Sequence, residues 1–372
     1  MRPPLSASVI TLNEEHNIRE CLDSLAWVDE LVVVDGGSTD GTKEICRGYT
    51  DKVFVNPWPG HYQQKNFALE CATHDWILSI DADERVSLAL RHEIENVLAR
   101  PDRADGYTIP RRNIFLGRWM RHGGWYPDRV LRLFRKSHGR FGGVNPHDRV
   151  ELRGRVGKLE ELLLHFTYRS VALYVDKQYR YACIAARERT VRKKPQAPGV
   201  TAMAGRPLIK FLEAYLLKRG FLDGFHGLLT ALFAASFAFV RQAKIRELSG
   251  AGWRMGKNVP TVTEGAGGLD AWFAGFNRDT DVAAANALRE KRAVRWWDIL
   301  FRPVPVFLRL YILKGGVRKR ADGFIYAGLG AFSEFTKYAK MWEALDPSLG
   351  PYGRGGILRD LSQPAEMPAR RG

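Results

Sequence analysis

The feature that most constrains this chain is an apolar run, residues 76–80, that ends abruptly in Asp81-Ala82-Asp83. Side chains alternate along a strand, so Asp81 and Asp83 are expected to point the same way. At the carboxyl end of a sheet strand they would lie in the crevice where open α/β sheets bind ligands. Carboxylates with substrate phosphates favour Mg²⁺ or Mn²⁺. The alternative is a solvated acidic turn.

The residues before this run alternate between strand and helix patterns. Strands are expected at 5–12, 31–34 and 53–55, and the apolar residues between 18 and 25 recur at helical spacing. Asn13 suits the cap of that first helix, and Ser38, Thr39 or Asp40 suits the cap of the next. A further helix is expected at 63–73. This β-α-β-α-β-α-β order predicts a parallel, doubly wound nucleotide-binding sheet.

Polar residues follow these strands. Asp35 ends the second strand and is either a hydrogen-bond acceptor for a base or ribose or a plain turn aspartate. The glycines after it, Gly36 first, let the backbone turn tightly or approach a ligand. Their pattern is neither a dinucleotide fingerprint nor a P-loop. Lys65 lies just ahead of the acidic strand, where it either meets a diphosphate or is solvated on a helix face.

Four motifs in order carry a resemblance to a known family: VITLNEE at 9–15, VDGGSTDGT at 34–42, QQKNFA at 63–68 and IDADERVS at 80–87. Together they resemble glycosyltransferase family 2, closest to the bacterial branch that includes lipooligosaccharide-core β-1,4-glucosyltransferases. The resemblance covers roughly residues 5–170. It implies a GT-A fold, a UDP-sugar donor, a divalent metal and inversion at the anomeric carbon.

The same resemblance assigns nucleotide-binding residues. Those matching Thr11, Glu14 and Asp35 line the uridine pocket in that family, and Asp81 and Asp83 match the ribose–diphosphate–metal end. Asn13, Gly36 and Lys65, inside these motifs, complete the expected nucleotide-binding set.

A glycine- and aromatic-rich stretch at 119–135 suits stacking on sugar faces and resembles the acceptor side of the same branch. An inverting transfer needs a base to take the proton of the acceptor hydroxyl. Asp128 is the first candidate and Asp148 the second, and each is otherwise a loop residue. His147 is a candidate metal ligand, since neutral imidazole is a common one. His165 is a weaker candidate for the same site.

The second half contains two similar helical stretches. Arg206-Pro207 recurs as Arg302-Pro303, and Asp223-Gly224-Phe225 recurs as Asp322-Gly323-Phe324. The expected domains are a catalytic domain at 1–170, helical modules at 171–248 and 269–346, a linker at 249–268 and a disordered tail at 347–372. The family branch usually has one such module, so the second is a departure from it.

Each module has a basic-aromatic segment followed by an apolar helix, the first of them at 224–240. The chain carries 57 basic and 41 acidic residues, a net charge of +16, which favours an anionic partner. We expect the modules to associate with an anionic membrane surface. The alternative is that they pack as a soluble bundle. An oligomer through these modules is also possible, and no recognition motif indicates nucleic acid.

Four scattered cysteines indicate a reducing compartment, and the N-terminus lacks the pattern of a secretion signal. The leading hypothesis is therefore a metal-dependent inverting glycosyltransferase, peripheral on the cytoplasmic face of a bacterial inner membrane. It would move a hexose, glucose first, from a UDP-sugar to a lipopolysaccharide-core or lipid-linked saccharide acceptor. The alternatives are a metal-dependent nucleotidyltransferase and a non-catalytic, membrane-peripheral binding protein.

Overall fold

The computed structural model of the chain describes residues 2–144, 147–192, 196–250, 268–290 and 294–346. The chain forms two compact units. The first consists of Met1–Ile114 with Trp125–Thr167, and the second of Phe115–Gly124 with Tyr168–Gly372. The linker expected at 249–268, apart from its ends, and the tail expected at 347–372 lie outside the described residues.

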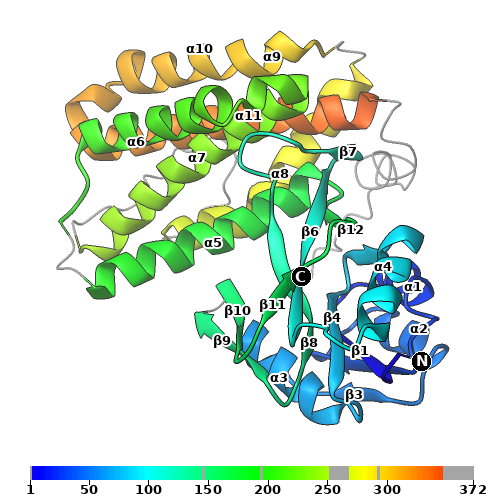
Figure 1. The fold of residues 1–372 in the computed structure, drawn as a ribbon. Coiled ribbons are helices and arrows are strands. Elements are labelled where there is room, and N and C mark those ends of the chain that lie inside the picture. The colour runs from blue at the N-terminus through cyan, green and yellow to red at the C-terminus, as the bar shows by residue number, and fades with distance from the viewer. Residues whose placement is uncertain (1, 145–146, 193–195, 251–267, 291–293, 347–372) are drawn as a thin grey trace, which may run out of the picture. The chain divides into compact units, whose positions relative to one another are not determined.

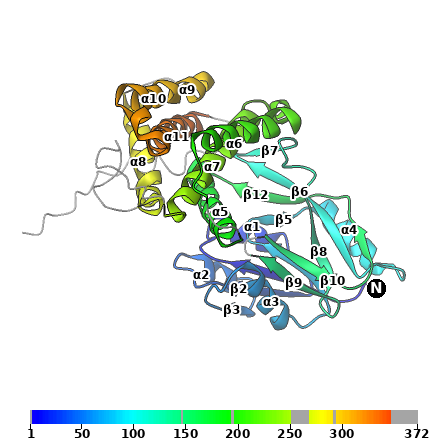
Figure 2. The same ribbon diagram turned by 90° about the vertical axis from the view of Figure 1, so that its left-hand side faces the viewer.

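The sheet of the first unit starts with four parallel strands (Figures 1 and 2): β1 (Leu5–Thr11), β2 (Glu30–Asp35), β3 (Val53–Val55) and β4 (Trp76–Asp81). Their order in space is β3-β2-β1-β4. The residues of β1 are all buried, as expected of a strand covered on both faces. Helices α1 (Ile18–Asp23), α2 (Thr42–Arg47) and α3 (His61–Cys71) connect the parallel strands.

Beyond β4 the sheet is no longer parallel, so the predicted doubly wound sheet is incomplete on this side. It continues through β8 (Arg129–Arg135), β6 (Gly106–Phe115), β12 (Leu163–Tyr168) and β5 (Glu84–Val86), with β8 antiparallel to β4 and β6. β11 (Val156–Lys158) pairs with β6, and β9 (Gly139–Val144) pairs with β10 (His147–Leu152) as a separate ribbon. This antiparallel part brings residues from 106–168 beside the end of β4.

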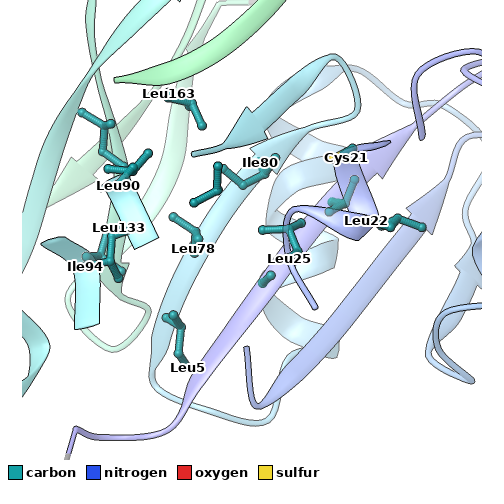
Figure 3. Packing of buried hydrophobic residues seen from close by; sticks show 14 of the residues in the cluster. Leu5, Cys21, Leu22, Leu25, Leu78, Ile80, Leu90, Ile94, Leu133 and Leu163 are labelled. Atoms are coloured by element: carbon teal, nitrogen blue, oxygen red, sulfur yellow. The ribbon is translucent and has the colours of Figure 1, made fainter. Parts of the chain in front are cut away.

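One core cluster joins the parallel and antiparallel parts of this unit (Figure 3). Leu5 of β1 and Leu78 of β4 are fully buried in it with Leu22 of α1 and Leu163 of β12. Leu90 comes from α4 (Leu88–Ala99). Burying a leucine of this size contributes about 1.5–3 kcal/mol, so the cluster fixes both halves of the sheet relative to each other.

The first helix begins later than the sequence pattern suggested. α1 starts at Ile18 with Asn17 at its N-cap, so the prediction that Asn13 caps it is wrong. Asn13 instead has a positive φ of 55°. Its Oδ1 accepts a hydrogen bond of 2.8 Å from the backbone N–H of Thr39, in the loop after β2. The polar side chain therefore joins two loops instead of starting a helix.

The second unit is helical in its described residues apart from the short strand β7 (Arg118–Trp119) and the end residues of β6 and β12. Two of its helices, α7 and α11, are largely buried, with the side chains of Phe233 and Phe335 packed edge to face. The helical elements are α5 (Val171–Arg192), α6 (Val200–Leu212), η1 (Glu213–Leu217), η2 (Gly220–Asp223), α7 (Gly224–Leu248), α8 (Leu269–Arg289), α9 (Trp296–Phe301), α10 (Pro303–Leu308), η3 (Arg309–Leu313), η4 (Gly316–Lys319) and α11 (Arg320–Leu345).

By length and composition, one described helical stretch, Gly220–Leu248, is apolar enough to cross a membrane. Its most apolar window is 56% buried inside the protein, and the core helix of a soluble protein meets the same criterion. The stretch therefore gives only weak evidence of a membrane span.

A buried acid in this unit holds the segment Phe115–Gly124 in place. Asp223 Oδ2 accepts backbone hydrogen bonds from Arg121 (3.0 Å) and His122 (2.8 Å), and Asp223 Oδ1 lies 3.0 Å from His122 Nδ1. The carboxylate is thus satisfied by three groups of one loop, as a buried charge requires.

Candidate active site

Three polar residues end neighbouring parallel strands at one edge of the sheet. The strand register pairs Thr11 of β1 with Asp35 of β2, and Ile10, the residue before Thr11, with Asp81 of β4. The carboxyl ends of parallel strands are where such sheets bind ligands. The backbone therefore brings together three of the predicted nucleotide-binding residues.

The loops after β1 and β2 are joined by hydrogen bonds between them. The N–H of Asn13 donates to Ser38 Oγ (2.8 Å), and the N–H of Glu14 donates to Thr42 Oγ1 (2.8 Å). Asp35 is fully buried, and its Oδ2 accepts from the N–H groups of Gly37 and Ser38, both at 2.8 Å. Asp35 therefore fixes the conformation of the loop after β2.

The predicted cap of the second helix is also different. Gly41 occupies the N-cap position of α2, and no side chain caps there. Asp40 Oδ1 accepts from the N–H of Thr42 (3.1 Å), one residue into the helix. Asp40 thus accepts a hydrogen bond from a backbone N–H of the first turn of α2 without occupying the N-cap position.

Two residues of this wall have a specific environment. A Cβ on Gly36 would lie 2.7 Å from Trp58 Cε3, so glycine is needed there for the packing of the indole. Thr11 is buried, and its hydroxyl has no hydrogen-bond partner among the described residues. A buried polar atom without a partner is costly, which makes the Thr11 hydroxyl a group that a ligand could satisfy.

Asp81 lies in a cluster of buried charges. Its Oδ2 accepts a very short hydrogen bond from Arg132 Nη2, and its Oδ1 lies 3.1 Å from Lys65 Nζ. Burial of Asp81 disfavours its ionised form. Arg132 and Lys65 outweigh that effect and hold the pKa of the carboxyl well below its usual range. Asp81 is therefore an anion at any physiological pH.

The cluster extends through Glu84, which is fully buried. Glu84 Oε1 lies 2.7 Å from Arg132 Nη2 and 3.5 Å from Arg111 Nη1. Arg111 in turn pairs with Asp128, with Nη2 2.7 Å from Oδ2. The three cations Lys65, Arg111 and Arg132 are thus matched by the three anions Asp81, Glu84 and Asp128.

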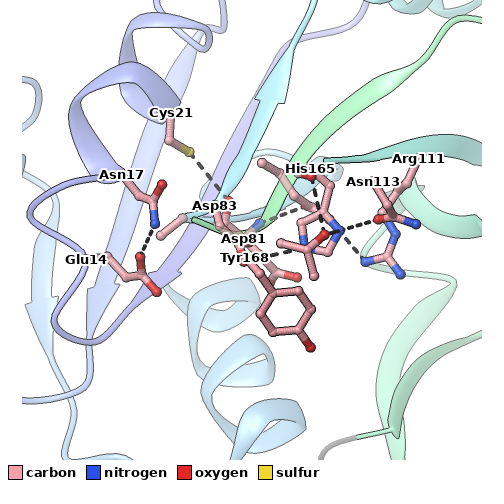
Figure 4. A network of polar contacts seen from close by, with 12 residues as sticks. Glu14, Asn17, Cys21, Asp81, Asp83, Arg111, Asn113, His165 and Tyr168 are labelled. Atoms are coloured by element: carbon pink, nitrogen blue, oxygen red, sulfur yellow. Dashed lines mark hydrogen bonds and ion pairs between the residues drawn. The ribbon is translucent and has the colours of Figure 1, made fainter. Parts of the chain in front are cut away.

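The second acid of the motif lies beside a histidine (Figure 4). Asp83 Oδ2 is 3.4 Å from Nε2 of His165, which comes from β12. The other ring nitrogen, Nδ1, is 2.6 Å from Asn113 Oδ1. The motif acid and a residue far along the chain therefore form one local site.

Asn113 fixes which nitrogen of His165 carries the proton. Its Nδ2 lies 2.9 Å from Trp125 O and 2.9 Å from Asp128 Oδ2, which both only accept hydrogen bonds. The amide orientation is therefore set, Oδ1 faces the imidazole, and Nδ1 of His165 must donate. The other ring nitrogen, Nε2, then faces the Asp83 carboxylate. Two electron-rich atoms at this distance need a proton or a cation between them.

An oxygen and an imidazole nitrogen are ligands that Mn²⁺ and Mg²⁺ accept, imidazole suiting Mn²⁺ better. Asp83 and His165 fit such an ion, and the hydrogen bond from Nδ1 to Asn113 is the usual support of a ligating histidine. Among the described residues no group of three or more His, Cys, Asp or Glu could hold a metal. Two protein ligands leave room for the phosphate oxygens of a substrate.

The remaining predicted residues are placed as follows. His147 and Asp148 begin β10, paired in register with Val144 and Gly143, and their side chains are outside the described part of the structure. Their predicted roles stay predictions. Asp128 is partly exposed, and its Oδ2 is occupied by Arg111 and Asn113.

Sequence reasoning did not single out Arg111, Asn113 or Glu84 as site residues. Arg132 is buried in the site, whereas Arg129 and Arg135 pair with surface acids, Glu160 and Asp75. Arg132 lies between two leucines in the apolar run of β8. A charged residue inside such a run was the sequence signal that could have identified it as a site residue.

A parallel sheet of nucleotide-binding type, with acids, buried cations and a histidine at its carboxyl edge, defines an α/β enzyme class that handles anionic ligands. The family model described as glycosyl transferase family 2 matches residues 6–151. The chain belongs to this family, since it covers 92% of a relative that is 34% identical. The fold of the first unit is accordingly GT-A.

That relative is the lipopolysaccharide core biosynthesis glycosyltransferase LpsC of Rhizobium meliloti, aligned over 254 residues, or 65% of this chain. An uncharacterized glycosyltransferase of Rickettsia typhi is 32% identical over 257 residues, 66% of this chain and 87% of that protein. These alignments support a glycosyltransferase with a lipopolysaccharide-core relative.

Two solved structures are more distant. TarS of S. aureus is 16% identical at a TM-score of 0.33, over 71% of this chain and 98% of that one. Glucosyl-3-phosphoglycerate synthase of Mycobacterium tuberculosis, solved with Mn²⁺ and UDP, is 23% identical at a TM-score of 0.26. That alignment spans 30% of this chain and 44% of that one. At these scores neither supports a statement about the ligands of this chain.

Proposed function

We propose that this chain is a metal-dependent, inverting hexosyltransferase that uses a UDP-sugar, with UDP-glucose as the first donor to test. The acceptor is a lipopolysaccharide-core or lipid-linked saccharide. Family membership supports sugar transfer, and the relative LpsC supports the acceptor class. The arrangement of charges at the end of β4 supports the proposed metal.

The charge balance of the site is the observation that carries the proposal. Lys65, Arg111 and Arg132 are already matched by buried or half-buried acids. Asp83 is a further acid beside this cluster, and a diphosphate bound there would need positive charge to offset its own. A divalent cation held by Asp83 and His165 would supply that charge and help the diphosphate to leave.

The other residues of the site have roles that need no metal. The unsatisfied hydroxyl of Thr11 and the Asp35 loop form the wall proposed to hold uridine. Asp81, fixed as an anion between Lys65 and Arg132, would face the ribose end of the nucleotide. Lys65 and Arg132 could turn toward the diphosphate as its charge increases, because they share Asp81 between them.

In the transfer step, the acceptor hydroxyl oxygen attacks the anomeric carbon as the bond from that carbon to the diphosphate oxygen breaks. The hydroxyl proton passes to a base, and UDP leaves. Asp128 is the proposed base. Its Oδ2 is held by Arg111 and Asn113, and its Oδ1 is not engaged by any residue in the described part of the chain. Asp148 is the second candidate.

We also propose that the protein works at the cytoplasmic face of a bacterial inner membrane, bound peripherally. The net charge of +16 and the proposed lipid-linked acceptor support this location.

The test is a panel of UDP-sugars with and without Mn²⁺, using truncated lipopolysaccharide core as the acceptor and measuring UDP release and product linkage. We expect turnover of one UDP-hexose, dependent on metal, with inverted anomeric configuration. Retention of configuration, or pyrophosphate release from a nucleoside triphosphate, would contradict the proposal.

A further inference from the structure

The two halves of the second unit share an unusual backbone feature. The π-helical turn η1 and the 3-10 turn η2 are repeated by η3 and η4, each 96 residues further along the chain. Gly227 and Gly323 have the same offset, and a Cβ on either would lie 1.8 Å from the carbonyl oxygen of Gly220 or Gly316. By this criterion Gly323 corresponds to Gly227. The sequence match of Asp322-Gly323-Phe324 to Asp223-Gly224-Phe225 pairs Gly323 with Gly224 instead, so that match is out of register with the structure.

Exposed apolar side chains follow the same offset. The most exposed pair is Leu217 and Leu313, which are 80% and 81% exposed. Large apolar side chains are seldom so exposed on a surface that binds no partner, and here equivalent positions are exposed in both segments. The other exposed pairs are Leu208 and Val304, Leu212 and Leu308, Leu216 and Ile312, and Phe221 and Val317.

Both segments border the same apolar pocket, of about 420 Å³. Its wall includes Met203 and Pro207 of α6, and Pro303 and Phe307 of α10. The starts of the two exposed segments, at Pro207 and Pro303, are therefore neighbours on this unit. We define the apolar-basic face as residues 207–222 together with residues 303–319.

Basic residues lie among these apolar side chains, and the two segments differ in how far acids offset them. In the first segment, Glu213 lies 3.1 Å from Lys210 and 2.6 Å from Lys218. In the second, residues 299–321 contain no acidic residue, and Arg309 stands where Glu213 stands in the first. Within residues 303–319 its basic residues are Arg309, Lys314, Arg318 and Lys319, and Arg302, just before them, pairs with Asp298 at 3.2 Å.

We propose that the apolar-basic face binds the surface of an anionic lipid bilayer. Leu217 and Leu313 enter the interface between headgroups and acyl chains, and the second segment supplies most of the charge that binds anionic lipid. This differs from insertion of the apolar helix α7, whose Leu229, Phe233 and Val240 are fully buried inside the protein. α7 packs against the first segment of the face and α11 against the second.

This inference deepens the proposed membrane location and rests on it. Its test measures lipid binding without any donor or acceptor, so it can fail while sugar transfer succeeds, and the reverse. The full chain is mixed with vesicles of phosphatidylcholine with phosphatidylglycerol, or of phosphatidylcholine alone, and co-sedimentation gives the partition coefficient.

The apolar arm of the test uses the double variant Leu217→Ser/Leu313→Ser. We expect its partition onto anionic vesicles to fall by about tenfold or more, since two exposed leucines lose their transfer to an apolar environment. The matched control is Val191→Ser on α5, outside the face, where the valine is 86% exposed. It should partition as the unmodified chain does. Equal partition of the double variant and the control would overturn the proposal.

The charge arm compares Lys314→Gln/Arg318→Gln/Lys319→Gln with Lys210→Gln/Lys218→Gln. We expect the triple variant to lose most of the dependence of binding on salt and on anionic lipid, and the double variant to lose little, because Glu213 already offsets its lysines. Equal binding to neutral and anionic vesicles would overturn the charge assignment.

The remaining occupant to test is a second copy of the chain. If the unmodified chain is a dimer by light scattering, Leu217→Ser/Leu313→Ser makes it monomeric, and neither binds vesicles, the face is a self-interface and the membrane proposal is wrong.

Discussion

Nε2 of His165 lies 3.4 Å from Oδ2 of Asp83, and the hydrogen bond between Nδ1 and Asn113 Oδ1 leaves Nε2 directed at that carboxylate. Asp83 lies between β4 and β5, and His165 lies in β12, which pairs antiparallel with β5. A carboxylate and an imidazole that face each other are two side chains that could ligate the proposed metal. The predictions about catalysis start from this pair.

Replacing Asp83 tests the metal assignment. We expect Asp83→Ala to abolish turnover while leaving the fold intact, because the side chain is partly exposed and belongs to no core cluster. Transfer rates and thermal unfolding measured on the same preparation separate the two effects. Normal transfer by Asp83→Ala would refute the assignment.

Replacing Asn113 tests the positioning of His165. Asn113→Ala removes the acceptor that holds the proton on Nδ1, and loss of such a supporting group costs about 10- to 100-fold in metal affinity. We expect that loss in a Mn²⁺ titration, with activity partly rescued at high Mn²⁺. Thr167→Val is the control, since its hydroxyl lies farther from Nδ1, at 3.3 Å. An unchanged Mn²⁺ affinity in Asn113→Ala would show that the amide has no role in the site.

Removing Arg132 should destabilise the protein as well as inactivate it. Arg132→Met leaves Asp81 and the fully buried Glu84 without their main partner. Breaking a buried ion pair typically costs about 3–5 kcal/mol, to be measured by urea unfolding. Arg140→Gln removes an exposed pair with Glu70 and should cost at most about 1 kcal/mol. Similar losses of unfolding free energy in the two variants would show that the ion pairs of Arg132 contribute no more than an exposed pair.

A buried acid in the second unit predicts how stability depends on pH. Burial raises the pKa of Glu343 from 4.5 to about 8, although the N–H of Val171 and the charge of Lys340 act in the opposite direction. The folded state therefore holds a proton that the unfolded state loses, so stability falls as pH rises from about 4.5 to 8. Glu343→Gln should flatten this fall and raise the unfolding temperature at pH 8 relative to the unmodified chain.

Glu334→Gln, on the same helix and paired with Lys337, is the control for that measurement and should leave the pH profile unchanged. A profile for Glu343→Gln that runs parallel to that of the unmodified chain would contradict the assignment.

The parallel half of the fold was readable from sequence because its signals are local. The apolar runs ending at Asp35 and Asp81 gave the strands β2 and β4 and the edge at which their acids meet. Asn13 was misread because its partner, Thr39, lies in a different loop, and a capping rule considers only the residues that follow.

The rest of the site depends on contacts between distant segments. His165 reaches Asp83 only because β12 and β5 pair antiparallel, with His165 opposite Glu84. Hydrophobicity alone suggested that helix 224–240 meets the membrane, but that pattern does not distinguish a buried helix from a lipid-facing one. The exposed leucines of η1 and η3 became visible only with the packing.

The most direct test of the central claim is calorimetric titration of UDP into the protein with and without Mn²⁺, for the unmodified chain and for His165→Ala and Asp83→Ala. The account predicts UDP binding that requires Mn²⁺ in the unmodified chain and is lost in both variants. Equal UDP affinity with and without the metal, or unchanged Mn²⁺-dependent binding in either variant, would contradict it.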